Sequence, residues 1–183
     1  VESVPAWLFL VAHLFGWPRR FVYRYGAMEV SAPGVEAVAL AVTVATVVSL
    51  AALVILRFSG RLDDASPADI ALVVVLVSMV TSRVLSPQYL VWVGGIAAVC
   101  LLDRGTRMRP VIALLMPVAA LGQILYPMHY DWLLSDRWEG LALHTARILL
   151  LLVATGWGLT RLMRGRPGTA AGVDAVQEVR QPA

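Results

Sequence analysis

The most constraining feature of this sequence is its set of apolar runs, several of which approach or exceed the roughly 18–20 residues needed to cross a bilayer. Hydrophobic residues make up 59% of the 183-residue chain, and the mean hydropathy is +0.75. An ordinary soluble domain is less apolar than this. The sequence therefore predicts an all-α fold, a polytopic transmembrane helical bundle.

The predicted transmembrane domain covers residues 1–163, and its helices are expected at residues 34–56, 70–83, 87–102, 110–127 and 140–163. An apolar run at residues 4–16 is too short to span, which leaves a truncated, re-entrant or interfacial helix. Residues 17–33 and 128–139 are polar and aromatic, and we expect loops there. Residues 164–183 combine Gly, Pro, Ala and charge, a composition that predicts a disordered cytoplasmic tail.

The apolar stretch at residues 70–102 is interrupted at Ser86-Pro87. As one helix it would be about 50 Å long, against a hydrocarbon core of about 30 Å. Ser caps helices, and Pro is tolerated in a first helical turn but not in a helix interior. Two short helices joined by a tight turn are therefore expected. Ser66-Pro67 has the same pattern and predicts the start of the first of them.

Arginine counts predict the orientation. With the C-terminus inside, nine arginines fall in inside segments and four in outside segments; the nine are Arg57, Arg61, Arg104, Arg107, Arg109, Arg161, Arg164, Arg166 and Arg180. Cytoplasmic loops are enriched in arginine and lysine. A cytoplasmic C-terminus in a cell membrane is therefore expected, although Arg19, Arg20 and Arg24 fall outside.

Two further arginines, Arg83 and Arg147, lie inside apolar segments, where a charged group is costly and often functional. In the predicted orientation both approach the outer membrane face, as do the polar residues Gln88, Tyr89, Gln123, Tyr126 and His144. An outward-opening polar chamber that contains both guanidinium groups would suit an anionic ligand, because arginine matches phosphate oxygens. The two cations can lie near each other only if an anion, or a nearby carboxylate such as Glu2, offsets their charge. The alternatives are snorkelling of Arg147 to the interface and ordinary packing of His144.

Three short patterns together resemble a known family. The first is Ser86-Pro87-Gln88-Tyr89-Leu90-Val91-Trp92. The others are Glu2-Ser3-Val4 before a short helix, and Gln123-Ile124-Leu125-Tyr126-Pro127 followed by Tyr130 and Ala146-Arg147. Their order and spacing resemble the C-terminal half of actinobacterial membrane glycosyltransferases of family 87, which have the GT-C fold. Gly122 and Ile148 stand where that family has Thr and Asn.

The resemblance implies a hexosyltransferase that moves a sugar, mannose in related enzymes, from a polyprenyl-phosphate donor to a glycan or lipid acceptor outside the cytoplasm. The family's catalytic carboxylate lies upstream of the matching region, so the catalytic residue stays unknown. The expected donor-binding residues are Glu2, Arg83, Gln88, Tyr89, Gln123, Tyr126 and Arg147. No metal, cofactor or nucleic-acid partner is expected, since the single cysteine and the charge pattern supply no such site.

Two other classes remain open. Broken helices with polar groups also occur in transporters and channels, where sites lie near the midplane and repeats are common. The polar residues here are off-centre, and the sequence has no evident internal repeat. A non-catalytic membrane scaffold would leave the two apolar-segment arginines unexplained.

The predicted orientation is testable by cysteine labelling. In a Cys100→Ala background, Ser135→Cys should react with an impermeant thiol reagent in intact cells, because the arginine bias puts residues 128–139 outside. Labelling that requires permeabilised membranes would contradict the orientation.

Overall fold

The computed structural model describes residues 1–24, 26–85 and 89–164. This part of the chain is mainly helical, with seven α-helices, one π-helix and a two-stranded antiparallel sheet. In order, the elements are α1 (Val4–His13), β1 (Arg20–Arg24), β2 (Ala27–Ser31), α2 (Val35–Phe58), α3 (Pro67–Val80), α4 (Tyr89–Leu102), α5 (Arg109–Gln123), η1 (Ile124–Met128), α6 (Tyr130–Leu134) and α7 (Trp138–Met163).

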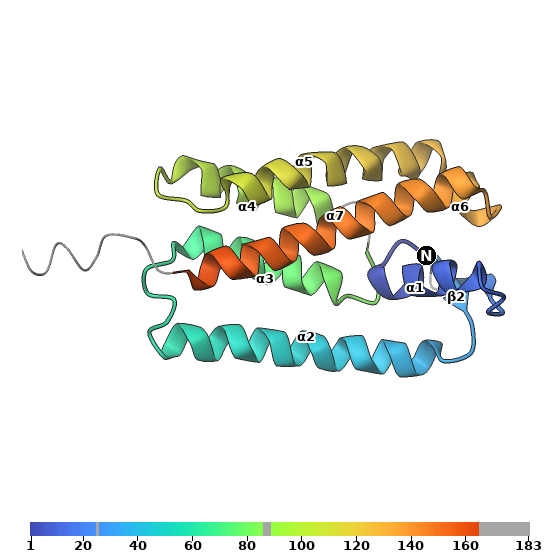
Figure 1. The fold of residues 1–183 in the computed structure, drawn as a ribbon, viewed down its shortest axis with the longest axis horizontal. Coiled ribbons are helices and arrows are strands. Elements are labelled where there is room, and N and C mark those ends of the chain that lie inside the picture. The colour runs from blue at the N-terminus through green and yellow to red at the C-terminus, as the bar shows by residue number, and fades with distance from the viewer. Residues whose placement is uncertain (25, 86–88, 165–183) are drawn as a thin grey trace, which may run out of the picture.

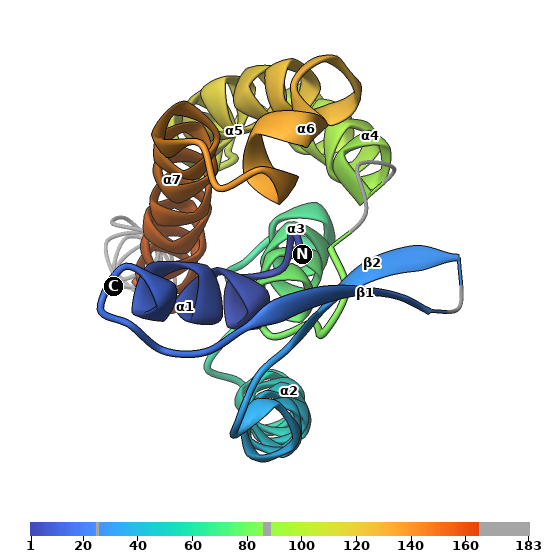
Figure 2. The same cartoon turned by 90° about the vertical axis from the view of Figure 1, so that its right-hand side faces the viewer.

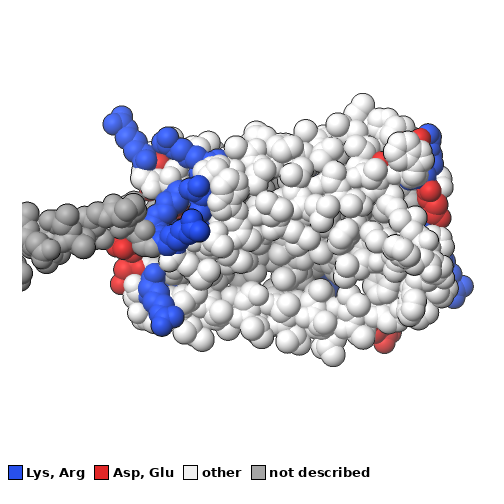
Figure 3. All heavy atoms as spheres, viewed as in Figure 1, with Lys and Arg blue, Asp and Glu red and all other residues white. Residues whose placement is uncertain are grey.

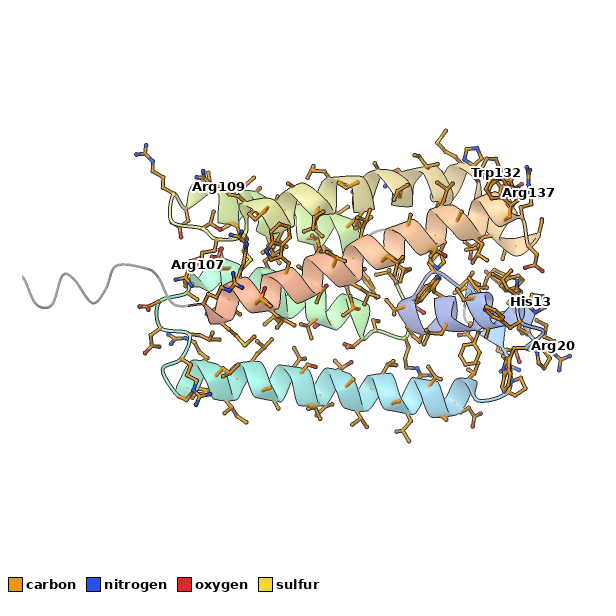
Figure 4. All side chains as sticks on the ribbon, in the orientation of Figure 1. His13, Arg20, Arg107, Arg109, Trp132 and Arg137 are labelled. Atoms are coloured by element: carbon orange, nitrogen blue, oxygen red, sulfur yellow. The ribbon has the colours of Figure 1, made fainter. Side chains whose placement is uncertain are left out.

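Three helical segments are long and apolar enough to cross a membrane: α2, α5 with η1, and α7. They run along the long axis of the molecule (Figure 1). Charged side chains gather at its two ends and leave a belt of uncharged surface between them (Figure 3). We call one end the arginine-rich end; it carries Arg107 and Arg109. The hairpin end carries His13, Arg20, Trp132 and Arg137 (Figure 4).

The predicted break in residues 70–102 is confirmed, because α3 and α4 are separate helices of 14 residues each. The first helix ends at Val80, three residues before the predicted boundary. The Ser82 hydroxyl then forms a local turn: it donates to the Val84 carbonyl at 2.6 Å and accepts from the Val84 amide. Arg83 is therefore in the non-helical connection, while Ser86 and Pro87 lie outside the described residues.

The predicted start of α3 is also confirmed. The Ser66 side chain accepts a hydrogen bond from the Asp69 amide at 3.1 Å, and Pro67 opens the helix. Asp69 is buried and accepts hydrogen bonds from the Thr106 hydroxyl at 2.6 Å and the Arg107 amide at 3.2 Å. This carboxylate therefore fastens the start of α3 to the loop before α5 at the arginine-rich end.

The expectation of a loop throughout residues 17–33 is wrong, and the mainly helical fold carries one small sheet. Arg20–Arg24 and Ala27–Ser31 pair as an antiparallel hairpin, with Phe21 opposite Val30. Aromatic and β-branched side chains favour strands, and Gly26 adopts the positive φ of 79° that the turn requires. Phe21 and Val30 pack with Phe9 and Leu10 of α1. Tertiary packing thus orders a segment whose polar and aromatic composition suggested a loop.

Residues 128–139 are not a simple loop either. The helix α6 forms at Tyr130–Leu134, and α7 starts at Trp138 inside the predicted loop. Leu133 is buried with Leu125 and α1. Gly140 allows α6 to lie directly on α7, since a Cβ there would be 2.7 Å from the Trp132 carbonyl carbon.

Helices α1, α3, α5 and α6 pack against α7. Buried side chains of α3, α4, α5 and α7 make the larger core toward the arginine-rich end. The short helix α1 and the hairpin occupy the other half, beside the end of α3 (Figure 1). Viewed along the long axis, α2 stands apart from the other helices (Figure 2), and only 6% of its apolar window is buried.

The contact at Gly140 predicts a stability difference between two glycines of α7. Gly140→Ala should destabilise the fold by about 1–3 kcal/mol, because the new methyl group would meet backbone atoms that cannot move aside. Gly156→Ala is the matched control: nothing lies within 4 Å of its Cβ position. It should be neutral or stabilise by up to about 1 kcal/mol. Thermal unfolding in detergent micelles measures both, and equal unfolding temperatures would contradict the packing.

Candidate functional site

A buried ion pair joins the two ends of the described chain. The Arg147 guanidinium of α7 donates to the Glu2 carboxylate, with Nη1 and Oε2 2.8 Å apart. The two side chains are 1% and 9% exposed. A charge can be buried at such depth only when a partner of opposite sign offsets it. Arg147 is thus a packed, paired residue, and the snorkelling alternative is excluded by its burial.

Neighbouring residues explain how this pair is held. The Trp7 indole donates to the Thr145 hydroxyl at 2.9 Å, which docks α1 on α7. Ser3 caps α1 by accepting from the Ala6 amide, so Glu2 lies next to the positive end of the helix dipole. The missing side chain of Gly122 provides the space for Arg147, because a Cβ there would be 3.5 Å from Nε and 3.0 Å from Leu90 Cδ1.

A cavity of about 560 Å³ lies beside the ion pair, with Glu2 in its lining. It is enclosed by the start of α1, the strand β2, the start of α2, the connection after α3, and the η1–α6 region. Its charged and hydroxyl-bearing lining residues are Glu2, Ser3, Tyr23, Glu29, Arg83, Tyr126 and Tyr130. The cavity therefore presents one guanidinium, two carboxylates and three phenols, at the hairpin end of the apolar belt.

Tyr130 is the phenol most affected by these surroundings. Its burial, followed by the negative charge of Glu2 and the nearby Tyr126, raises the pKa of Tyr130 to about 12. The Tyr126 ring packs edge-to-face against it, with centroids 5.5 Å apart. Tyr130 consequently stays neutral at physiological pH and can donate a hydrogen bond to an anion.

The structure separates the two arginines that were expected to share a chamber. Arg83 is exposed and lines the cavity. Arg147 does not line it, since the Glu2 carboxylate lies between the guanidinium and the open space. The prediction that both guanidinium groups face one cavity is therefore wrong for Arg147. The physical reason is that the Glu2 carboxylate, and not an anionic ligand, supplies the countercharge of Arg147.

Of the remaining residues predicted for the site, some line the cavity and others do not. Tyr126 lines the cavity with Arg83. Gln123 is exposed and lines neither this cavity nor the second cavity described below. Gln88 lies outside the described residues. His144 is fully buried one turn before Arg147, and among the described residues neither ring nitrogen has a hydrogen-bond partner.

A second cavity, of about 540 Å³, lies between α2 and α3. It shares Arg83 and Val84 with the first cavity. Its other lining residues are Thr43, Thr46, Val47, Ser78, Thr81, Ser82 and Tyr89. Tyr89 is thus separated from the first cavity and lies on the α3–α4 side of Arg83.

Sequence reasoning missed Glu29 and the α2 side of both cavities. Glu29 pairs across the hairpin with Val22 and reaches the cavity from β2. The aromatic and β-branched residues Phe21, Val22 and Tyr23, followed by Gly26, carried a strand and turn signal. Among the described residues, no group of three or more His, Cys, Asp and Glu side chains could hold a metal ion.

Comparisons of the chain with protein-family models, with curated proteins and with solved structures give no match.

The ion pair predicts non-additive effects of mutation. Arg147→Met should destabilise the fold by about 3–5 kcal/mol, because it leaves the Glu2 carboxylate buried without a countercharge. Adding Glu2→Gln removes that charge, so the double variant should be more stable than Arg147→Met alone. Denaturant unfolding in micelles of the wild type, both single variants and the double variant gives the coupling energy. Additive effects would contradict the pairing.

Proposed function

We propose that this chain is the donor-side part of a membrane glycosyltransferase, which moves a sugar from a polyprenyl phosphate to an extracytoplasmic acceptor. The observation that carries the proposal is the cavity in which Arg83 shares the lining with Tyr126 and Tyr130, beside an uncharged belt. Such a lipid has a charged headgroup, which a polar cavity can bind, and a long hydrocarbon chain, which an uncharged surface can cover. The motif resemblance described above points to the same substrate class, with mannose as the sugar.

The arrangement in the membrane is part of this proposal. The segments α2, α5 with η1, and α7 would cross the bilayer as a polytopic bundle. The short helices α1, α3 and α4 would each reach part of the way. With the arginine-rich end in the cytoplasm, the cavity would open in the outer half of the membrane, where an extracytoplasmic acceptor could reach it.

The proposed chemistry is substitution at the anomeric carbon of the sugar. The acceptor oxygen forms a new bond to that carbon, the bond to the phosphate oxygen breaks, and a base takes the hydroxyl proton. The leaving polyprenyl phosphate gains negative charge as this bond breaks. Arg83 would stabilise that charge with its guanidinium, and the neutral Tyr130 would donate a further hydrogen bond.

The Glu2–Arg147 pair has a supporting role in this mechanism. An isolated Glu2 carboxylate on the cavity wall would repel a phosphate. Arg147 lies 2.8 Å behind it and offsets that charge. The other charged side chains of the lining are Arg83 and Glu29, which is exposed on the hairpin. Arg147 therefore acts through Glu2, whereas Arg83 is the group expected to touch the phosphate.

Transfer from a polyprenyl-phosphate sugar, assayed in membranes and normalised to protein level, tests the proposal. A hydrogen bond to a charged group contributes about 1.5–3 kcal/mol, so Arg83→Ala should lower donor kcat/KM roughly ten- to hundredfold. Arg83→Lys should recover only part of it, because an ammonium cannot make the forked contact.

Arg20→Ala is the matched control, since Arg20 is exposed at the hairpin end and does not line the cavity. It should keep wild-type transfer. Full activity of Arg83→Ala would refute the donor-site role. Uptake of a charged solute by the wild type without any sugar transfer would favour the transporter class instead.

A further inference from the structure

One face of α2 lines both cavities. Val35, Val38 and Ala39 line the larger cavity, and Thr43, Thr46 and Val47 line the second. Their successive spacings of three, one, four, three and one residues keep all six on a single helix face. From residue 35 to residue 47 this face is about 18 Å long. The two cavities thus follow one another along one face of α2, and both have Arg83 and Val84 in their linings. We call this face of α2, with the two cavities beside it, the α2 groove.

The second half of this groove has a surface that an apolar chain can cover. The hydroxyls of Thr43, Ser78 and Thr81 each donate to a carbonyl four residues earlier in their own helix, at 2.8 Å. The Thr46 hydroxyl is 2.8 Å from both the Val42 carbonyl and the Thr81 hydroxyl. Because these donors are already used, hydrocarbon can replace water against them without leaving a buried donor unpaired.

We propose that this α2 groove binds the isoprenoid chain of a polyprenyl phosphate, with the phosphate at Arg83 and the headgroup in the larger cavity. Arg83 lies at the junction of the two parts, where an anionic group would separate a sugar from a hydrocarbon. The exposed position of α2 leaves the groove reachable from the apolar belt. The inference rests on the proposed function for its choice of lipid.

Two adjacent valines of α2 provide a matched test. Val47 lines the groove and is 63% exposed, whereas Val48 does not line it and is 60% exposed. Neither side chain packs in the core, so a tryptophan at either site leaves the fold intact. In membranes containing the protein, a diazirine-bearing polyprenyl phosphate without sugar is photo-crosslinked, and labelling is normalised to protein level.

Val47→Trp should lower labelling about tenfold, because displacing two methylene groups costs about 0.8 kcal/mol each. Val48→Trp should label as the wild type does. Thr43→Trp against Val44→Trp repeats the comparison one turn away, since only Thr43 lines the groove. Equal labelling of the paired variants would overturn the proposal. So would equal competition by a phosphatidylglycerol of matched concentration, which would indicate a general lipid surface.

The assay separates this inference from the proposed function. Labelling that depends on residue 47, in a protein that transfers no sugar, would support the groove and refute the transferase. Sugar transfer with equal labelling of Val47→Trp and Val48→Trp would support the transferase and overturn the groove. Sugar transfer that Val47→Trp slows only for long-chain donors, and not for a donor with a short isoprenyl chain, would support both.

Discussion

Burying the Arg147 guanidinium inside α7 requires a countercharge, and the chain supplies it from Glu2, at the far end of the described sequence. This requirement fixes where α1 lies, because Glu2 immediately precedes that helix and Trp7 holds it to α7. The position of α1 in turn supports the hairpin, whose Phe21 and Val30 pack against Phe9 and Leu10. The wall of the larger cavity is therefore a consequence of the ion pair, even though Arg147 itself does not line that cavity.

The half-length helices create the space in which the site forms. A helix of 14 residues is about 21 Å long, so α3 and α4 end part of the way along α7 and α5. The non-helical connection after α3 places Arg83 at the cavity, part of the way along the long helices. The short α1 and the hairpin fill the other half (Figure 1). Space left between these two partial layers and α2 becomes the cavity and the groove.

Sequence patterns predicted the long helices, the break in residues 70–102 and the start of α3 at Ser66, because these follow from local propensity and from length. The hairpin and α6 depend on tertiary packing, so local composition misassigned them. For the two arginines, the sequence indicated that a countercharge is needed, but it did not decide between an anionic ligand and a carboxylate such as Glu2. Glu2 is 145 positions from Arg147, and nothing in the spacing of the two residues reveals that they pair. The sequence likewise does not show that α2 lines both cavities, because the face of α2 that does so is set by its packing against α3.

The difference between the two arginines follows from their partners. Arg147 has its charge neutralised at 2.8 Å by a carboxylate that is 9% exposed, which leaves it little attraction for a further anion. Arg83 forms no ion pair among the described residues and faces a cavity with Tyr130, a neutral hydrogen-bond donor. An arginine without an ion-pair partner can bind an anion that enters the cavity. Because Glu2 offsets the charge of Arg147, whereas Arg83 faces the cavity, we assign Arg83 a functional role and Arg147 a structural one.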